Sequence, residues 1–303
     1  MATVIADAEL VADCRNTLGE GVLWSAEHRR VYWTDIAESK LWELDPETGK
    51  TEVWSLPARL GSFAFCGGSR LLLALEKQLA YFDLSGEKPI VPLRDVERDI
   101  AETRSNDGRC DRAGNFVFGS MNDRFDGRPL GAFYQFSRDG VLKRLALGDV
   151  QIANGICFSP DGRTLYYCDS PLREIRCCRY DAATAQVSEQ RLFASLGDQV
   201  GVPDGSVVDA DGCVWNAVWG GACVVRYRPD GSRDAVIHVP VPNPTCVGFG
   251  GDQLDELYIT TSRQEMTNEQ LAAAPTAGGL YRVKVPVRGI PEPHFTSSLS
   301  GRA

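Results

Sequence analysis

Acidic and amide side chains recur directly before glycines that are spread along the chain. Four of these pairs have glycines that share one phase of a repeat: Glu20-Gly21, Asp107-Gly108 (with Asn106 in front), Asn154-Gly155 and Asp204-Gly205. Oxygen atoms of Asp, Glu and Asn are the ligands that hard divalent cations prefer. Burying several of these groups together is costly unless a cation pairs them. If the fold brings them together, they predict one bound divalent metal.

A turn signal is the alternative interpretation, because Asp and Asn commonly precede glycine in turns. Four pairs in one phase, including a glutamate that caps turns poorly, favour metal binding. An all-oxygen ligand set favours Ca²⁺, Mg²⁺ or Mn²⁺, with Zn²⁺ or Fe²⁺ as the other choices. The three histidines, His28, His238 and His294, are far apart in the sequence. Their separation argues against a histidine-rich zinc site or a Ser-His-Asp triad.

A repeat would position these side chains. Each unit has a glycine at the start of an apolar strand, then a turn, an aromatic-rich strand and a further strand. The phase-matched glycines are Gly21, Gly61, Gly108, Gly155, Gly205 and Gly248, separated by 40, 47, 47, 50 and 43 residues. A period in the forties with three or four short strands per unit is typical of propeller blades. The sequence predicts an all-β, six-bladed β-propeller with four-stranded blades around a central channel.

No linker divides the chain, so we expect one propeller domain over residues 1–303, with peripheral termini at about 1–15 and 293–303. One helical turn is expected in the last blade, where Thr267 can cap it with Gln270 three residues on. In a propeller, equivalent positions are related by rotation about the central axis. The residues that enter the innermost strands therefore ring one end of the channel.

The composition of the chain limits the kinds of molecule that it can bind. A net charge of −9 argues against a broad basic face for nucleic acid or an acidic membrane. The chain has no apolar run of membrane-spanning length and no signal-peptide pattern, so we expect a soluble, cytoplasmic protein that is a monomer or a weak oligomer. The ten cysteines are dispersed without CxxC pairs. They are therefore interpreted as free, mostly buried thiols.

Four motifs at blade spacing resemble the gluconolactonase family, which includes regucalcin (senescence marker protein) and aldonolactonases. They are LGEGVLW from Leu18, TRSNDGRCDRAGNFVFGSM from Thr103, IANGICFSPDGRTLYYCDS from Ile152 and VPDGSVVDADGCVWNAVWGG from Val202. The resemblance covers nearly the whole chain in order. It implies a propeller hydrolase (EC 3.1.1 type) of carbohydrate metabolism that opens a sugar lactone, either an aldonolactone or an aldarolactone, to the sugar acid.

The resemblance also implies roles for individual residues. The single divalent metal is held by the residues that match Glu20, Asn154 and Asp204. The substrate-contacting motif falls on Arg104, Asn106 and Asp107, and a further acidic position of the family falls on Asp123, where the match is less clean. Arg124 and Arg128 are candidate extra cations near the channel mouth, and they favour an acidic sugar lactone slightly.

A lactone needs a polarised carbonyl, a delivered water and a proton for the departing ring oxygen. We expect Asp204 to double as the general base, with Asp107 as the alternative. Two other functions stay open at this point. One is a related propeller esterase or phosphotriesterase-like hydrolase, and the other is a non-catalytic calcium-binding propeller.

Overall fold

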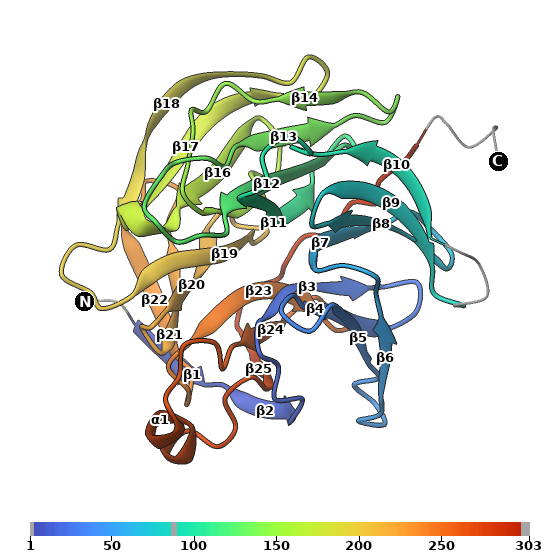
Figure 1. The fold of residues 1–303 in the computed structure, drawn as a ribbon. Coiled ribbons are helices and arrows are strands. Elements are labelled where there is room, and N and C mark those ends of the chain that lie inside the picture. The colour runs from blue at the N-terminus through green and yellow to red at the C-terminus, as the bar shows by residue number, and fades with distance from the viewer. Residues whose placement is uncertain (1–2, 86–89, 298–303) are drawn as a thin grey trace.

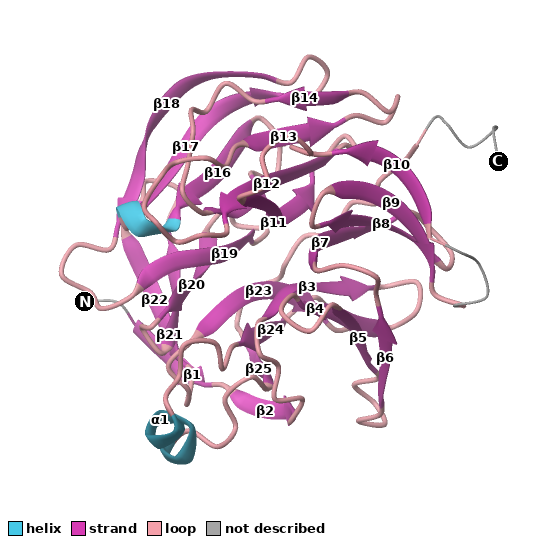
Figure 2. Cartoon of the chain, viewed as in Figure 1, coloured by secondary structure: helices cyan, strands magenta, loops and turns pink. Residues whose placement is uncertain are grey.

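The computed structural model describes residues 3–85 and 90–297, which form six largely antiparallel sheets arranged around a central axis (Figure 1). Strands make up almost all of the regular structure (Figure 2). Each sheet begins with an inner strand at the axis and proceeds outward in chain order, except that two sheets end on an edge strand from the N-terminal segment. The predicted six-bladed β-propeller is confirmed.

The first three blades follow this order without exception. Blade 1 consists of β3 (Gly19–Ser25), β4 (Arg30–Asp35), β5 (Lys40–Leu44) and β6 (Thr51–Ser55). Blade 2 consists of β7 (Leu60–Phe65), β8 (Arg70–Leu75), β9 (Gln78–Asp83) and β10 (Val91–Asp95). Blade 3 consists of β11 (Thr103–Cys110), β12 (Phe116–Asn122), β13 (Phe133–Phe136) and β14 (Leu142–Arg144).

The N-terminal segment completes the last two blades. Blade 4 consists of β15 (Ala153–Phe158), β16 (Thr164–Asp169), β17 (Glu174–Asp181) and β18 (Gln186–Ser195), with the 3-10 helix η1 (Ser170–Leu172) between β16 and β17. Blade 5 consists of β19 (Val202–Val208), β20 (Val214–Trp219), β21 (Cys223–Tyr227), β22 (Arg233–His238) and a parallel edge strand, β1 (Thr3–Asp7). Blade 6 consists of β23 (Pro244–Gly250), β24 (Glu256–Thr261), β25 (Leu280–Lys284) and β2 (Glu9–Ala12). The start of the chain thus closes the ring, a pairing that the repeat pattern did not reveal.

The helix α1 (Asn268–Ala273) lies between β24 and β25 of blade 6, where a helical turn was predicted. Thr267 accepts a hydrogen bond from the Gln270 backbone N–H, and the Gln270 side chain accepts one from the Thr267 N–H. This reciprocal pair is a capping box, which satisfies two amides at the helix start. No helix among the described residues has the length and hydropathy of a membrane-crossing segment.

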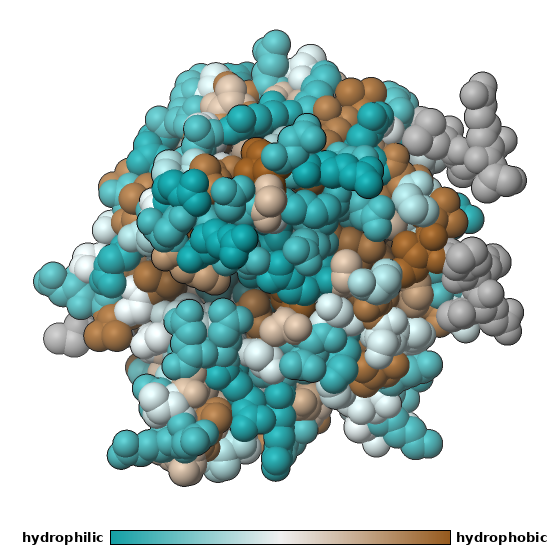
Figure 3. Space-filling view, in the orientation of Figure 1, coloured by the Kyte–Doolittle hydropathy of each residue, from teal (hydrophilic) through white to brown (hydrophobic). Residues whose placement is uncertain are grey.

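The core is divided among the interfaces between neighbouring blades. Within the described chain, six clusters of buried apolar side chains are found, and each joins two adjacent blades. Successive side chains of a strand point to opposite faces of the sheet, so one strand contributes to the interfaces on both sides of its blade. Cys177, for example, packs between blades 4 and 5, whereas Cys178 packs between blades 3 and 4. Hydrophilic residues predominate on the face shown in Figure 3, and its hydrophobic patches are small and scattered.

Bulges interrupt all six inner strands near their beginnings. All six phase-matched glycines lie on inner strands. Four lie within the bulged stretch, whereas Gly108 pairs with Phe118 at its end and Gly248 lies beyond it. Two reasons for glycine are visible. Gly155 has φ +69°, a left-handed conformation that favours glycine, and a Cβ at Gly205 would lie 2.8 Å from the Cys246 Cα of the next blade. The repeat signal therefore reports how closely the inner strands approach one another.

The last described residues pass the ends of the inner strands. Gly289 N–H donates to Leu254 O at 2.7 Å, and Phe295 N–H donates to Phe65 O at 2.7 Å, so the segment crosses from blade 6 to blade 2. Between these points Glu292 pairs with Arg109, 3.4 Å apart. We expected a peripheral terminus over 293–303. Phe295 is instead buried, and residues 298–303 lie outside the described chain.

Candidate active site

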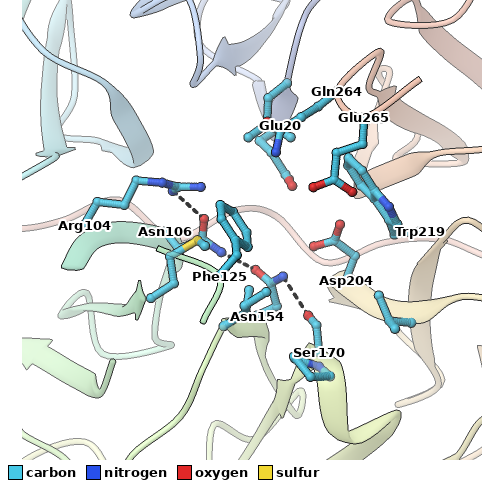
Figure 4. A pocket seen from close by; sticks show the side chains of 15 residues that line it. Glu20, Arg104, Asn106, Phe125, Asn154, Ser170, Asp204, Trp219, Gln264 and Glu265 are labelled. Carbon is cyan, nitrogen blue, oxygen red and sulfur yellow. Dashed lines mark hydrogen bonds between the residues drawn. The ribbon is translucent and has the colours of Figure 1, made fainter. Parts of the chain in front are cut away.

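A cavity of about 370 Å³ lies where the inner strands begin. Its polar floor is formed by residues from four blades: Glu20 on β3, Arg104 and Asn106 on β11, Asn154 on β15, Ser170 on η1 and Asp204 on β19. Figure 4 shows their polar ends converging from different directions. The bulge at the start of each inner strand changes the direction of a side chain locally. Side chains from separate inner strands can therefore point to one place in the channel.

Two carboxylates and one amide form the centre of this floor. Asn154 and Asp204 are each 5% exposed, and Glu20 is half-buried. Burial, with the negative charges of Asp204 and Asp107, raises the pKa of the Glu20 carboxyl well above its usual value. Burial and Asp107 raise the pKa of Asp204 in the same way. The Oδ1 atom of Asp204 is buried and accepts no hydrogen bond from the described residues.

A directed series of hydrogen bonds fixes the amide groups. Arg104 Nη1 donates to Asn106 Oδ1 at 2.7 Å, Asn106 Nδ2 donates to Asn154 Oδ1 at 2.7 Å, and Asn154 Nδ2 donates to Ser170 Oγ at 2.9 Å. Because both amino groups are used as donors, both amide orientations are determined. One lone pair of Asn154 Oδ1 remains for a further partner.

Arg104 is itself held by a charged network outside the cavity. Its Nε donates to Asp123 Oδ1 at 3.1 Å, and Arg59 donates to both Asp123 oxygens and both Glu76 oxygens at 2.8–3.1 Å. Although burial opposes the effect, Arg59 and Arg104 lower the pKa of Asp123. Asp123 therefore supports Arg104 and does not line the cavity.

The structure separates Asp107 from the group in which it was predicted. Its Oδ1 accepts from the Gly108 N–H and its Oδ2 from the Ile156 N–H, both at 2.8 Å. Asp107 is not among the cavity-lining residues. The bulge of β11 falls between Ser105 and Gly108, and Asn106 is the residue that it turns towards the cavity. The position that faces the site in blade 3 is thus one residue earlier than the glycine phase suggested.

Arg124 and Arg128 also lie outside the cavity lining. Both are exposed, and the Arg128 guanidinium pairs with Asp126 at 2.6 Å. The preference for an acidic substrate, which relied on these two cations, therefore loses its basis. Phe125 between them does line the cavity, although 56% of it is exposed.

Sequence reasoning missed most of the walls. The apolar part of the lining consists of Leu18, Met121, Phe125, Ile152, Pro171, Val202 and Trp219. Most of these residues lie in or beside the four motifs, but no period or residue type marked them as cavity walls. Gln264 and Glu265, in the loop after β24, belong to no motif. Figure 4 shows the Glu265 carboxylate directed towards those of Glu20 and Asp204.

The protein is thus a six-bladed β-propeller whose carboxylates and amides gather in a cavity at one end of the central channel. More particularly, the chain belongs to the SMP-30/gluconolactonase/LRE-like family, whose model matches residues 18–263. The predicted resemblance is thereby confirmed.

Individual relatives cover nearly the full chain. An L-arabinolactonase of Azospirillum brasilense is 41% identical over 97% of both chains. A 6-deoxy-6-sulfogluconolactonase of Pseudomonas putida is 33% identical over 92% of this chain and 95% of its own. The crystal structure of regucalcin from Agrobacterium tumefaciens strain C58, described as a calcium-binding protein, matches with a TM-score of 0.92 and 30% identity. It covers 97% of this chain and 99% of its own.

Proposed function

We propose that the protein is a metal-dependent sugar lactonase, which hydrolyses a sugar lactone to the open-chain sugar acid in the cavity at the start of the inner strands. Curated relatives that span almost the whole chain bear the names of sugar lactonases. The observation that carries the proposal is the buried, unpartnered Oδ1 of Asp204 beside Glu20 and Asn154.

The residues present fit a divalent cation. Glu20, Asn154 and Asp204 offer two carboxylates and one amide oxygen, and a charge of +2 offsets the repulsion that raises the carboxyl pKa values. Within the described chain, no group of three or more His, Cys, Asp or Glu side chains forms a metal-binding cluster, so Asn154 is needed as the third ligand. This set favours Ca²⁺, Mg²⁺ or Mn²⁺ over Zn²⁺ or Fe²⁺.

When bound, the cation polarises the lactone carbonyl. Arg104 and Asn106 hold the sugar hydroxyl groups and keep the carbonyl directed at the floor of the cavity. Asp204 accepts a proton from the attacking water while the water oxygen forms a bond to the carbonyl carbon. The bond between that carbon and the ring oxygen then breaks, and the proton is returned to the departing oxygen. Asp107 takes no part in this reaction, because it does not line the cavity and its oxygens accept from the backbone amides of Gly108 and Ile156.

The test is a pH-drop assay over a panel of aldono- and aldarolactones, with EDTA and with each divalent metal restored. We expect EDTA to abolish the rate and one or more metals to restore it. An Asp204→Ala variant that turned over at the wild-type rate with saturating metal would refute the assigned role of Asp204. Faster hydrolysis of paraoxon than of any lactone would favour the phosphotriesterase-like alternative. Tight calcium binding without hydrolysis of any ester would favour the non-catalytic one.

A further inference from the structure

Glu265 stands at the rim of the cavity with a free carboxylate. It lines the cavity, is exposed and belongs to the loop between β24 and α1. Its φ of +63° is a left-handed conformation that is uncommon for glutamate. Its side chain makes no hydrogen bond or ion pair with the described residues, yet Figure 4 shows it directed over Glu20 and Asp204.

Among the charged residues that line the cavity, every one except Glu265 has a matching charge in the structure or in the proposed function. Arg59 and Arg104 are matched by Glu76 and Asp123, to which they are bonded. The charges of Glu20 and Asp204 are matched by the divalent cation of the proposed function. No cation other than Arg104 lines the cavity within the described chain. Glu265 is therefore the residual negative charge at the entrance.

The walls increase the reach of that charge. Much of the lining is apolar, with Leu18, Val202 and Trp219 among its members, and Figure 4 shows Trp219 beside Glu265. Apolar walls lower the local dielectric and focus the field of a single charge across a small cavity. A substrate with an ionised group beyond its lactone ring would bring a second negative charge into this field without a matching cation.

We propose that Glu265 is a specificity-determining residue, which selects uncharged sugar lactones and excludes lactones that carry a second, ionised group. The inference rests on the proposed function and deepens it by naming the substrate class. The hydroxyl groups of an uncharged lactone are donors that the Glu265 carboxylate accepts. Selection of this kind works through repulsion of the wrong substrate as well as through contacts with the right one.

The experiment compares two lactones that differ at one carbon. D-glucono-1,4-lactone carries a hydroxymethyl group where D-glucaro-1,4-lactone carries a carboxylate. The ratio of their kcat/KM values is measured for wild type, Glu265→Gln and a matched control, Glu269→Gln, which removes an exposed carboxylate four residues further on. We expect Glu265→Gln to lower the preference for the uncharged lactone, expressed as this ratio, on the order of tenfold, as a short-range unit charge allows. Glu269→Gln should leave the ratio unchanged.

Salt supplies a second readout. The difference between Glu265→Gln and wild type should shrink as ionic strength rises from about 0.01 M to about 1 M, because the screening length falls from roughly 30 Å to roughly 3 Å. Manganese binding, measured by calorimetry, should be the same in both proteins. A large loss of manganese affinity in Glu265→Gln would overturn the inference and make Glu265 a metal ligand.

Failure of the inference and failure of the proposed function look different. If wild type hydrolyses the uncharged lactone and Glu265→Gln keeps the wild-type ratio of kcat/KM values, the role of Glu265 in substrate selection is refuted. The proposed lactonase function is then retained. If wild type hydrolyses neither these two lactones nor any other of the panel with any metal, the proposed function fails and the selection fails with it. Circular dichroism and thermal unfolding of the variant confirm that the comparison is between folded proteins.

Discussion

Asn106 donates a hydrogen bond from Nδ2 to Oδ1 of Asn154, 2.7 Å away, across the boundary between blades 3 and 4. The bond determines which atom of Asn154 faces the centre of the cavity, since an amide that rotated would present a donor there. Asn106 thus prepares a neutral ligand for the cation that we propose. Groups that orient a metal ligand are typically worth a factor of 10–100 in metal affinity or activity.

The first prediction follows from this bond. Asn106→Ala should lower manganese affinity by about tenfold or more, although Asn106 is not itself a ligand in the proposed site. Calorimetric titration of the metal-free protein measures the effect without recourse to activity. Ser105→Ala is the matched control, because it removes a buried, unpartnered hydroxyl from the adjacent position of the same strand and should leave the affinity unchanged. Wild-type affinity in Asn106→Ala would contradict the positioning role.

The second prediction separates two neighbouring acids. Asp107→Asn places an amino group against the backbone N–H of Gly108 or Ile156, so one buried donor loses its acceptor. We expect the free energy of unfolding to fall by about 1–3 kcal/mol, while kcat at saturating metal and substrate stays close to that of wild type. Urea unfolding and initial-rate kinetics measure the two quantities.

Asp204→Asn should give the opposite pattern. It changes a buried carboxylate whose Oδ1 has no hydrogen-bond partner among the described residues, and it relieves the repulsion with Glu20. The metal-free protein should therefore be as stable as wild type or more so, while turnover is lost. If Asp107→Asn instead lost turnover without a loss of stability, Asp107 would regain the role of general base.

The third prediction concerns Arg59, whose hydrogen bonds among the described residues go to Glu76 and Asp123. Arg59→Ala leaves Asp123 and Glu76 without their shared partner and loosens the support of Arg104. We expect KM for the lactone to rise by about tenfold, equivalent to about 1.4 kcal/mol, with little change in metal affinity. A fall in metal affinity with an unchanged KM would contradict a role confined to Arg104.

The same variant has a signature in the dependence of stability on pH. Hydrogen bonds from Arg59 lower the pKa of Glu76 below its ordinary 4.5, and Arg59 with Arg104 lowers that of Asp123 below 3.8. A lowered folded-state pKa gives stabilisation that is complete above the unfolded-state pKa and lost as pH falls through the folded-state value. The free energy of unfolding of wild type should therefore exceed that of Arg59→Ala by about 1 kcal/mol at neutral pH. The difference is modest because the charged groups are partly exposed. The difference should shrink below about pH 4, and a constant difference would contradict the linkage.

The fold was predictable because its constraints repeat. Glycine is needed where a Cβ would meet the neighbouring inner strand, as at Gly205 against Cys246, or where φ is positive, as at Gly155. Six such places leave a visible period. Closure of the ring by β1 and β2 was not predictable, since an edge strand pairs through its backbone and leaves little pattern in the sequence.

The floor of the site followed from the same period, but its details did not. A bulge shifts the register by one residue, and a shift of one residue exchanges the two faces of a strand. For this reason Asn106 faces the cavity where Asp107 was expected. The rim residues Phe125 and Glu265 come from loops, where neither period nor motif constrains the side chain, and only the three-dimensional structure shows that both line one cavity.

The last prediction concerns the end of the channel opposite the cavity. Phe295 is buried and stacks on Phe136 with a centroid separation of 5.5 Å, which ties the C-terminal segment to blade 3. Phe295→Ala should lower the free energy of unfolding by about 3–5 kcal/mol, as for other buried aromatic residues, while the metal affinity of the folded protein is retained. Phe125→Ala is the matched control, because the ring is 56% exposed and its loss should cost little stability. Equal urea midpoints for the two variants would show that the segment beyond Glu292 does not help to hold the propeller closed.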